Sequence, residues 1–538
     1  WNKTNNLADT SSDHGKNLNS VVTDGDQPPL SSCTVSAPGK ILIAGGYLVL
    51  ERPNIGITIG ATSRFYATVC EQEHDRAREN LLISVESPQF HTSYSYSYDL
   101  DQNNLTVLSG SGNEFVEKCL TLTLSFARKT FIVGDSSFET KIKSMAANKK
   151  KLAIKLRADN DFYSQIKELQ ARNLPLLSES LKTLPAFFPC PKDKDDRVLV
   201  AKTGMGSSAA MTTALVGAIL HFFGVVNLQD DVRRPRQTDN SHVSPKSDTR
   251  SKSTVHNLAQ LAHAVAQGKI GSGFDVSAAV YGSQIYQRFD QGNFKDEYAS
   301  ISQQKICDDA LFTCVTNEEL WDQTVDALEL PPGFDVIMGD VMGGSSSSSM
   351  ARGVLKWKNS KDEKEAPAIW NGLAENNKAI SEGLTELLEA SKVHVHAYKT
   401  VILRASKVPH NEWKDIDCCG APEKDIVNML LSVKAKFKTS RQLLKRMGEC
   451  SGQGIEPAEQ TSLADDTEAL AGVLCAGVPG AGGVDAIFAI TLSAGARLGV
   501  EKMWSERDNN GGFVCPLMLS ATSTKKSGIW FEKDISWD

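Results

Sequence analysis

The residues best suited to binding a ligand form a glycine-rich loop in the middle of the chain. Gly204-Met205-Gly206 is followed by Ser207, Ser208 and Ala209, and the chain then stays apolar almost all round as far as Phe223. A helix of that composition should be buried. Glycines let main-chain N–H groups approach an anion closely, and a helix N-terminus adds unpaired donors and positive potential. The pattern therefore predicts an anion site, with two serine hydroxyls able to bind phosphate oxygens or Mg²⁺.

Two other interpretations of this loop stay open. Serine is a favoured N-cap, so the loop could be no more than the start of a helix. The spacing Gly204-x-Gly206-x-x-Ala209 also matches a dinucleotide-binding pattern, with Asp230 and Asp231 at a plausible distance along the chain. That pattern requires a second strand where this sequence is charged and contains proline, so a dehydrogenase is disfavoured. The Walker pattern of P-loop enzymes is absent.

Lysines flank the glycine-rich segments although the chain is acidic overall. The 58 Lys and Arg residues are outnumbered by 65 Asp and Glu, which gives a formal net charge of -7. Such a balance disfavours a general nucleic-acid-binding protein. An anionic ligand must therefore be held by local geometry. Lys40, in the Pro38-Gly39-Lys40 turn, is the leading cation, followed by Lys202 and Lys269, for which a solvated surface position is the alternative.

The composition along the 538 residues predicts a tail and two lobes. Residues 1–32 are polar and are expected to form a disordered tail. A first lobe should span 33–330, interrupted by a charged, mobile insertion at 229–253. Composition changes between 290 and 332, and a second lobe is expected over 331–538.

Apolar periodicity predicts the local structure around these segments. A strand, a tight turn and a second strand are expected over 35–50, and a sheet-edge ribbon over 143–155. Further strands are expected at 65–70, 81–85, 130–133, 197–201, 335–340 and 486–491. Helices are expected at 113–128, 209–223, 255–268, 274–281, 369–390 and 426–448.

Eleven cysteines are scattered along the chain without a C-x-x-C pair, which disfavours a zinc site and a disulfide framework and favours a reducing compartment. No stretch approaches the roughly 20 apolar residues of a membrane helix. We expect a cytoplasmic protein without a membrane or nucleic-acid partner, a monomer or a weak homodimer. A peroxisomal location is the alternative, although the C-terminal Ile-Ser-Trp-Asp is not a peroxisomal signal.

Three segments resemble, in their order along the chain, the motifs of the GHMP small-molecule kinases: 36–40, 204–210 and 479–483. Within that superfamily, longer strings are similar to those of the eukaryotic-type phosphomevalonate kinases, and they lie at 45–53, 202–204, 266–276, 343–346 and 476–483. One such loop would be a weak signal. Five strings in the right order are specific, and with the first motif they span most of the chain, from about Ser36 to Thr491.

The resemblance implies an α+β, two-lobed GHMP kinase fold. Its N-terminal lobe would be of the ribosomal-protein-S5-like α/β type and its C-terminal lobe ferredoxin-like, with ATP and substrate in the cleft between them. The implied reaction uses Mg²⁺ and transfers the γ-phosphoryl of ATP to (R)-5-phosphomevalonate, giving (R)-5-diphosphomevalonate and ADP. Another GHMP enzyme (mevalonate kinase or diphosphomevalonate decarboxylase) and a non-catalytic ligand sensor on the same scaffold are the alternatives.

The resemblance also implies catalytic roles. Lys40 matches the lysine that the family places near the transferred group, and Lys202 is a second candidate. Asp275 matches an acidic residue that often serves as the general base in relatives acting on alcohols. Here the acceptor is a phosphate monoester with a second pKa of about 6, mostly dianionic at neutral pH. We therefore expect Asp275 to orient Lys40 and the acceptor; a helix N-cap is its alternative role.

The remaining expected roles concern the two substrates and the metal. ATP phosphates are expected at Gly204, Met205, Gly206, Ser207, Ser208 and Ala209, and Mg²⁺ at Ser208 or, as second choice, Ser207. The acceptor is expected at Lys269, Ser272, Gly273, Ser345, Ser346, Gly480, Ala481 and Gly482. For the serine run that begins at Ser345, a flexible linker is the alternative.

This sequence departs from the family pattern at several places. The family commonly has Thr-Pro where Ser347-Ser348 stand. Mevalonate kinases carry a glutamate where Gly46-Tyr47 stands, and this difference favours the phosphomevalonate branch. Ala264 occupies the position of the glutamate that those enzymes use on Mg²⁺, so no acidic metal ligand is assigned. His256 and His263 share one helix face and are expected to be packed helix residues, with contact to the cleft as the alternative.

Overall fold

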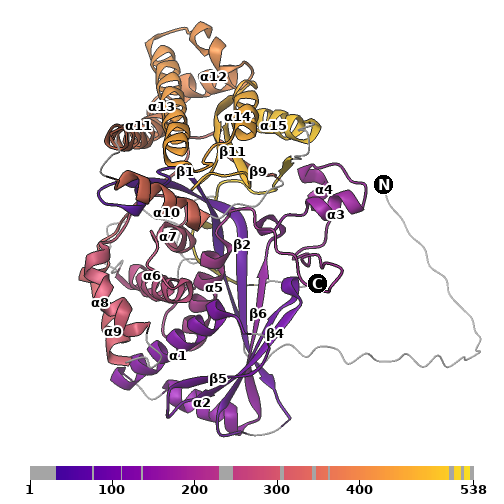
Figure 1. The fold of residues 1–538 in the computed structure, drawn as a ribbon, viewed down its shortest axis with the longest axis vertical. Helices are drawn as coiled ribbons and strands as arrows, with labels where there is room; N and C mark the ends of the chain where they lie inside the picture. The colour runs from indigo at the N-terminus through magenta and orange to yellow at the C-terminus, as the bar shows by residue number, and fades with distance from the viewer. Residues whose placement is uncertain are drawn as a thin grey trace, which may run out of the picture.

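Two sheets, one in each lobe, organise the computed structural model of the chain (Figure 1). The structure describes residues 32–533 except for 76–77, 111, 135–136, 230–245, 303–307, 342–346, 361–363, 508–513 and 523–525. The predicted tail, most of the predicted insertion and the residues Ser345 and Ser346 therefore lie outside the described residues.

The N-terminal lobe is built on a nine-stranded sheet. Its main path runs β13-β1-β2-β6-β3-β4-β5, with β7 paired to β2 and β8 paired to β7. All pairs are antiparallel except β3 with β6, which is parallel. The strands are β1 (Ser32–Ala44), β2 (Ile55–Glu73), β3 (Leu81–Ser87), β4 (Thr92–Asp99), β5 (Asn104–Ser109), β6 (Lys150–Ala158), β7 (Gln284–Gln287), β8 (Thr324–Ala327) and β13 (Trp530–Glu532).

Helices cover this sheet, and the most deeply buried of them is α5 (Ser207–Phe222). It packs directly on β1 and β2, so its start is placed beside the middle of the sheet. Figure 1 shows α1, α5, α6 and α7 gathered on the same side of the long strand β2. The other helices of this lobe are α1 (Glu114–Gly134), α2 (Ser137–Ala147), α3 (Ile166–Ala171), α4 (Ser178–Lys182), α6 (Lys246–Gln267), α7 (Phe274–Tyr281), α8 (Gln291–Ile301) and α9 (Asp308–Thr316).

The C-terminal lobe has a four-stranded antiparallel sheet in the order β10-β11-β9-β12. In chain order that is 2-3-1-4 with helices after the first and third strands, which is the predicted ferredoxin-like topology. The strands are β9 (Asp335–Val341), β10 (Val473–Gly477), β11 (Ala486–Thr491) and β12 (Val514–Pro516). The helices are α10 (Ser347–Lys358), α11 (Ala366–Val393), α12 (Val395–Ala405), α13 (Ala421–Ser451), α14 (Ala458–Glu468) and α15 (Ala494–Glu506).

Several local predictions were wrong. The segment 197–201 forms no strand; Leu199 and Val200 are 37% and 43% exposed in a connection before the glycine-rich loop. Residues 130–133 continue α1, because packing of that helix on α5 and α6 outweighs their β-branched and aromatic composition. The expected turn at 38–40 is a register shift inside the single strand β1.

Other predictions were wrong in their boundaries. The ribbon expected over 143–155 divides into the end of α2 and the strand β6. That strand lies between β2 and β3, not at an edge; its alternate residues are buried, and Lys151 and Lys155 occupy the other face. Helix α6 begins at Lys246, so the last eight residues of the predicted insertion, 246–253, are helical.

The two lobes are joined by close backbone contacts near the end of β1. The amide of Gly480 donates to the carbonyl of Leu42 at 3.0 Å. The hydroxyl of Tyr47 donates to the carbonyl of Ala481 at 2.5 Å. A Cβ added to Gly46 would lie 2.2 Å from the carbonyl oxygen of Gly480, so only glycine permits this approach. The chain also returns to the first lobe at its end, where β13 pairs with β1.

We expect Gly46→Ala to destabilise the protein by about 1–3 kcal/mol, because the added methyl group would force the lobes apart at the Gly480 carbonyl. Gly499→Ala is the matched control: this glycine is exposed on α15 with nothing within 4 Å of an added Cβ. The control should be stabilised by about 0.5–1 kcal/mol. Urea unfolding measures both, and an unchanged Gly46→Ala midpoint would contradict the steric argument.

Candidate active site

The glycine-rich loop places the start of α5 where an anion can reach it. Gly204 and Gly206 have φ of +81° and +76°, left-handed conformations that favour glycine, and Gly206 is the N-cap of α5. The first N–H groups of a helix have no partner within the helix. Thr203, fully buried, anchors the loop by donating its hydroxyl to the carbonyl of Asp161 at 2.6 Å. The predicted anion site therefore has the expected backbone geometry.

Lys40 extends from β1 across this loop. Its main-chain amide donates to the carbonyl of Met205 at 3.0 Å, and its ammonium donates to the carbonyl of Gly204 at 2.7 Å. A Cβ on Gly206 would lie 3.2 Å from Cε of Lys40, so the lysine stem needs the glycine there. Burial lowers the pKa of Lys40, and the nearby carboxylate of Asp275 opposes that change. The Lys40 nitrogen is thus held at the start of α5.

Asp275 lies in the first turn of α7. Gly273, with φ of +83°, is the N-cap of this helix, so the alternative in which Asp275 is the cap is wrong. Its Oδ1 accepts a hydrogen bond from the amide of Val276 at 3.0 Å. The ring of the preceding residue, Phe274, has its centroid 5.5 Å from the ammonium of Lys40. Among the described residues, Asp275 and Lys40 act on each other electrostatically without a salt-bridge contact.

His263 belongs to this site. From the sequence, contact with the cleft was the less favoured alternative to a packed helix residue. Its Nε2 lies 3.1 Å from Oγ of Ser208, and its ring centroid lies 5.6 Å from that of Phe115. Burial lowers the pKa of His263, the carboxylate of Asp275 raises it, and Lys202 and Lys269 lower it further. These three charged groups therefore lie within electrostatic reach of one imidazole beside Ser208.

The position of His263 in the sequence carried a signal for its role. It stands one residue before Ala264, where mevalonate kinases have their metal-binding glutamate, and on the same helix face as His256. The other histidine is a packed helix residue, as predicted: His256 is fully buried, and burial lowers its pKa to about 4.

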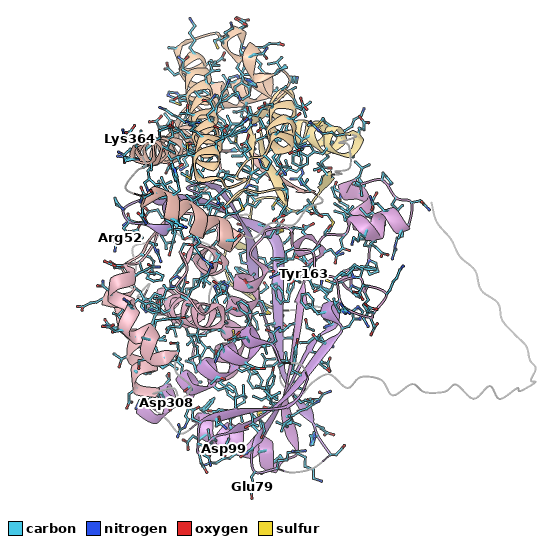
Figure 2. The ribbon with its side chains drawn as sticks, in the orientation of Figure 1. Arg52, Glu79, Asp99, Tyr163, Asp308 and Lys364 are labelled. Carbon is cyan, nitrogen blue, oxygen red and sulfur yellow. The ribbon has the colours of Figure 1, made fainter. Side chains whose placement is uncertain are left out.

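The serine hydroxyls at the start of α5 are both hydrogen-bonded to ring-bearing side chains. Ser207 bonds to the phenolic oxygen of Tyr163, and Ser208 bonds to His263. Figure 2 labels Tyr163 near the middle of the molecule, below the C-terminal lobe. Lys202 and Lys269 are exposed, so their ammonium groups can meet a ligand from solvent. The loop thus combines free backbone donors, two hydroxyls and nearby cations.

Two groups of the residues expected to hold the acceptor make defined contacts. Gly480, Ala481 and Gly482 approach the end of β1, where the Gly480 amide bonds to Leu42, two residues beyond Lys40. Gly482 faces Ile455, whose carbonyl would lie 2.2 Å from an added Cβ. In the second group, the carbonyls of Ser272 and Gly273 are bound by buried side chains, as described below.

Known proteins resemble this chain along most of its length. The peroxisomal phosphomevalonate kinase of Arabidopsis thaliana is 36% identical over 494 residues, which cover 88% of this chain and 92% of the relative. The chain belongs to the phosphomevalonate kinase family. A phosphomevalonate kinase of Aspergillus fumigatus is 30% identical over 85% of this chain and 87% of its own length. No family model matches the chain.

The phosphomevalonate kinase family also supplies a solved structure with the same fold. Streptococcus pneumoniae phosphomevalonate kinase, in complex with phosphomevalonate and AMPPNP, matches with a TM-score of 0.50 at 14% identity, covering 88% of this chain and 96% of that one. At that identity the likeness shows the GHMP kinase fold alone. In the described residues, no helix is long and apolar enough to span a membrane.

The donor set at the start of α5 fits a magnesium ion that is shared with phosphates. No group of three or more His, Cys, Asp or Glu side chains in the described part of the chain could hold a metal by itself. Mg²⁺ in kinases usually has one or two protein ligands, with phosphate oxygens and waters completing the octahedron. The hydroxyl of Ser208, which lies 3.1 Å from Nε2 of His263, is one protein ligand of that kind.

We expect Lys40→Ala to lower turnover by at least about 10²–10³-fold, because it removes the cation beside the phosphate loop. Lys141→Ala is a matched control. Lys141 also donates to a main-chain carbonyl, that of Phe222 at 3.0 Å, and contacts its ring, but at the far end of α5. A steady-state assay of ADP release should show near-normal turnover for the control. Equal losses in the two variants would exclude a specific role for Lys40.

Proposed function

We propose that this protein transfers the γ-phosphoryl group of ATP to (R)-5-phosphomevalonate, giving (R)-5-diphosphomevalonate and ADP. The observation that carries the proposal is the ammonium of Lys40, bound to the Gly204 carbonyl at the start of α5, in a chain of the phosphomevalonate kinase family. Phosphoryl transfer depends mainly on positioning and on neutralising charge. A lysine at a helix start can both position a triphosphate and neutralise part of its charge.

In this proposal the ATP phosphates bind the loop from Gly204 to Ala209. The free amides at the start of α5 donate hydrogen bonds to the β- and γ-phosphates, as helix N-termini commonly do. Ser208, and secondarily Ser207, bind Mg²⁺, which neutralises charge on the nucleotide when bound. His263 holds the Ser208 hydroxyl in place. Lys202 and Lys269, both exposed, add positive charge on the side from which substrates enter.

The acceptor lies between Lys40 and the loops that carry Ser272, Gly273 and Gly480 to Gly482. An oxygen of its phosphate attacks the γ-phosphorus, a new P–O bond forms, and the bond to the oxygen that leaves on ADP breaks. A phosphate monoester with a pKa of about 6 is mostly a dianion at neutral pH, so no proton has to be removed first. Asp275 then orients Lys40 and the acceptor.

The substrate is tested by measuring ADP release with mevalonate, phosphomevalonate and diphosphomevalonate as separate acceptors. We expect turnover with phosphomevalonate and at least about 100-fold lower kcat/KM with mevalonate, which lacks the phosphate that the cations are placed to bind. Preferred turnover of mevalonate, or release of carbon dioxide from diphosphomevalonate, would assign another GHMP enzyme. A protein that binds ATP without turnover of any acceptor would be a ligand sensor.

We expect Asp275→Asn to lower kcat by about 10–100-fold, less than Lys40→Ala, because the residue orients groups and removes no essential proton. The pH dependence of kcat distinguishes an orienting role of Asp275 from a general-base role. In the variant, kcat should keep the wild-type dependence on pH, with the acceptor phosphate as the titrating group near pH 6. A loss as large as that of Lys40→Ala, together with a flattened profile, would show that Asp275 is the general base.

We propose that the protein works in the cytoplasm. All ten described cysteines are free thiols, which supports a reducing compartment. The Arabidopsis relative is peroxisomal by name, so imaging of the tagged full chain against a peroxisomal marker tests the location.

A further inference from the structure

Arg288 is a buried cation that the family motifs do not include. It follows β7, is 4% exposed, and lies beneath the loop that precedes α7. Among the described residues, no carboxylate forms a salt bridge with it. A buried charge without an ionic partner is costly unless hydrogen bonds compensate it. The hydrogen bonds of Arg288 should therefore indicate its role in the structure.

The guanidinium of Arg288 joins two segments that are far apart in the sequence. Its Nη1 donates to the carbonyl of Leu50, at the end of the turn that follows Gly45-Gly46-Tyr47. Its Nη2 donates to the carbonyl of Gly271 at 2.5 Å. The ring of Phe289 has its centroid 5.6 Å from the guanidinium carbon. One side chain thus links the turn that ends at Leu50 to the loop that precedes α7.

Two neighbouring side chains bind the next carbonyls of the same loop. The hydroxyl of Tyr286 donates to the carbonyl of Ser272 at 3.0 Å. The amide of Gln260 donates to the carbonyl of Gly273 at 2.6 Å. Together with the Arg288 bond to Gly271, three successive carbonyls are each held by a buried side chain.

This arrangement orients the peptide groups of the loop. In a trans peptide the N–H and C=O bonds point in opposite directions. The amides of Ser272, Gly273 and Phe274 therefore point away from the buried side chains that hold the preceding carbonyls. Ser272 and Gly273 are among the residues that the family resemblance implies for acceptor binding. Gly273 cannot be replaced there, because an added Cβ would lie 2.9 Å from both Gln260 and Tyr286.

We propose that Arg288 is a positioning residue for the phosphoryl acceptor: its fork holds the Leu50 and Gly271 carbonyls, so that the turn ending at Leu50 and the amides of 272–274 form one preorganised anion-binding wall. The identity of the acceptor as phosphomevalonate rests on the function proposed above. Arginine suits the task because its planar fork can bond two carbonyls at once, whereas a lysine ammonium is a point donor. Its charge adds positive potential behind the wall.

Steady-state kinetics of Arg288→Met and Arg288→Lys test the proposal. We expect Arg288→Met to raise the KM for the acceptor at least about tenfold, since two buried carbonyls lose their donor, and to leave the KM for ATP within about twofold. Arg288→Lys keeps the charge but not the fork, so it should fall between wild type and Arg288→Met. Equal increases in the two KM values, or an unchanged acceptor KM, would overturn the proposal.

Arg64→Met is a matched control for loss of stability. Arg64 is also a buried arginine that donates to main-chain carbonyls, those of Ser36 and Gly528, but it serves the sheet and pairs with Glu532. We expect Arg64→Met to lower the unfolding temperature while the acceptor KM stays within about twofold. An acceptor KM that rises as much in this control as in Arg288→Met would assign the kinetic change to general destabilisation and refute the positioning role.

Hydrogen exchange of the ligand-free protein tests, independently of the reaction, whether Arg288 orders the two segments that it joins. Arg288→Met should increase amide exchange about tenfold or more in the peptides that cover 45–50 and 268–276, and not in those that cover 204–212. Unchanged exchange in the first two peptides would overturn the proposal that Arg288 orders these segments. If wild type fails to phosphorylate phosphomevalonate, the proposed function is wrong, but the exchange result still decides whether Arg288 orders these two segments.

Discussion

The structure depends on one contact, the ammonium of Lys40 bound to the carbonyl of Gly204 at the start of α5. A reaction between two polyanions needs positive charge at the transfer point, and this chain is acidic overall. Charge must therefore be supplied locally, by a lysine beside unpaired helix amides. Gly206 leaves room for the lysine stem to cross the backbone, and the apolar helix that follows packs on β1 and β2. The packing of α5 on β1 and β2 therefore also fixes where the Lys40 side chain meets the start of the helix.

Around this contact, the loops that would receive substrates are held from behind by buried polar side chains. His263 bonds to Ser208, and Arg288 bonds to the carbonyls of Leu50 and Gly271. These bonds satisfy groups that would otherwise be buried without partners. The C-terminal lobe completes the site through its glycine loop, which approaches the end of β1 so closely that Gly46 has no room for a side chain.

Sequence reasoning succeeded where a pattern is local. The buried helix expected over 209–223 is α5, and the short helix expected over 274–281 is α7. It failed where the environment overrides composition. Residues 130–133 are helical because they continue a packed helix, and 197–201 are exposed although they are apolar. Residue propensity is a weak guide when packing partners come from elsewhere in the chain.

The sequence by itself determined the motifs, the family and the loop in which the anion site is proposed, because glycine conformations and helix starts depend on residues a few positions apart. Only the tertiary structure decided which side chains support that site. His263 meets Ser208 across 55 residues, and Arg288 meets Leu50 across 238. Such pairs leave no periodic trace in one sequence, since they are set by how the strands and helices pack, and packing requires the whole chain to be folded.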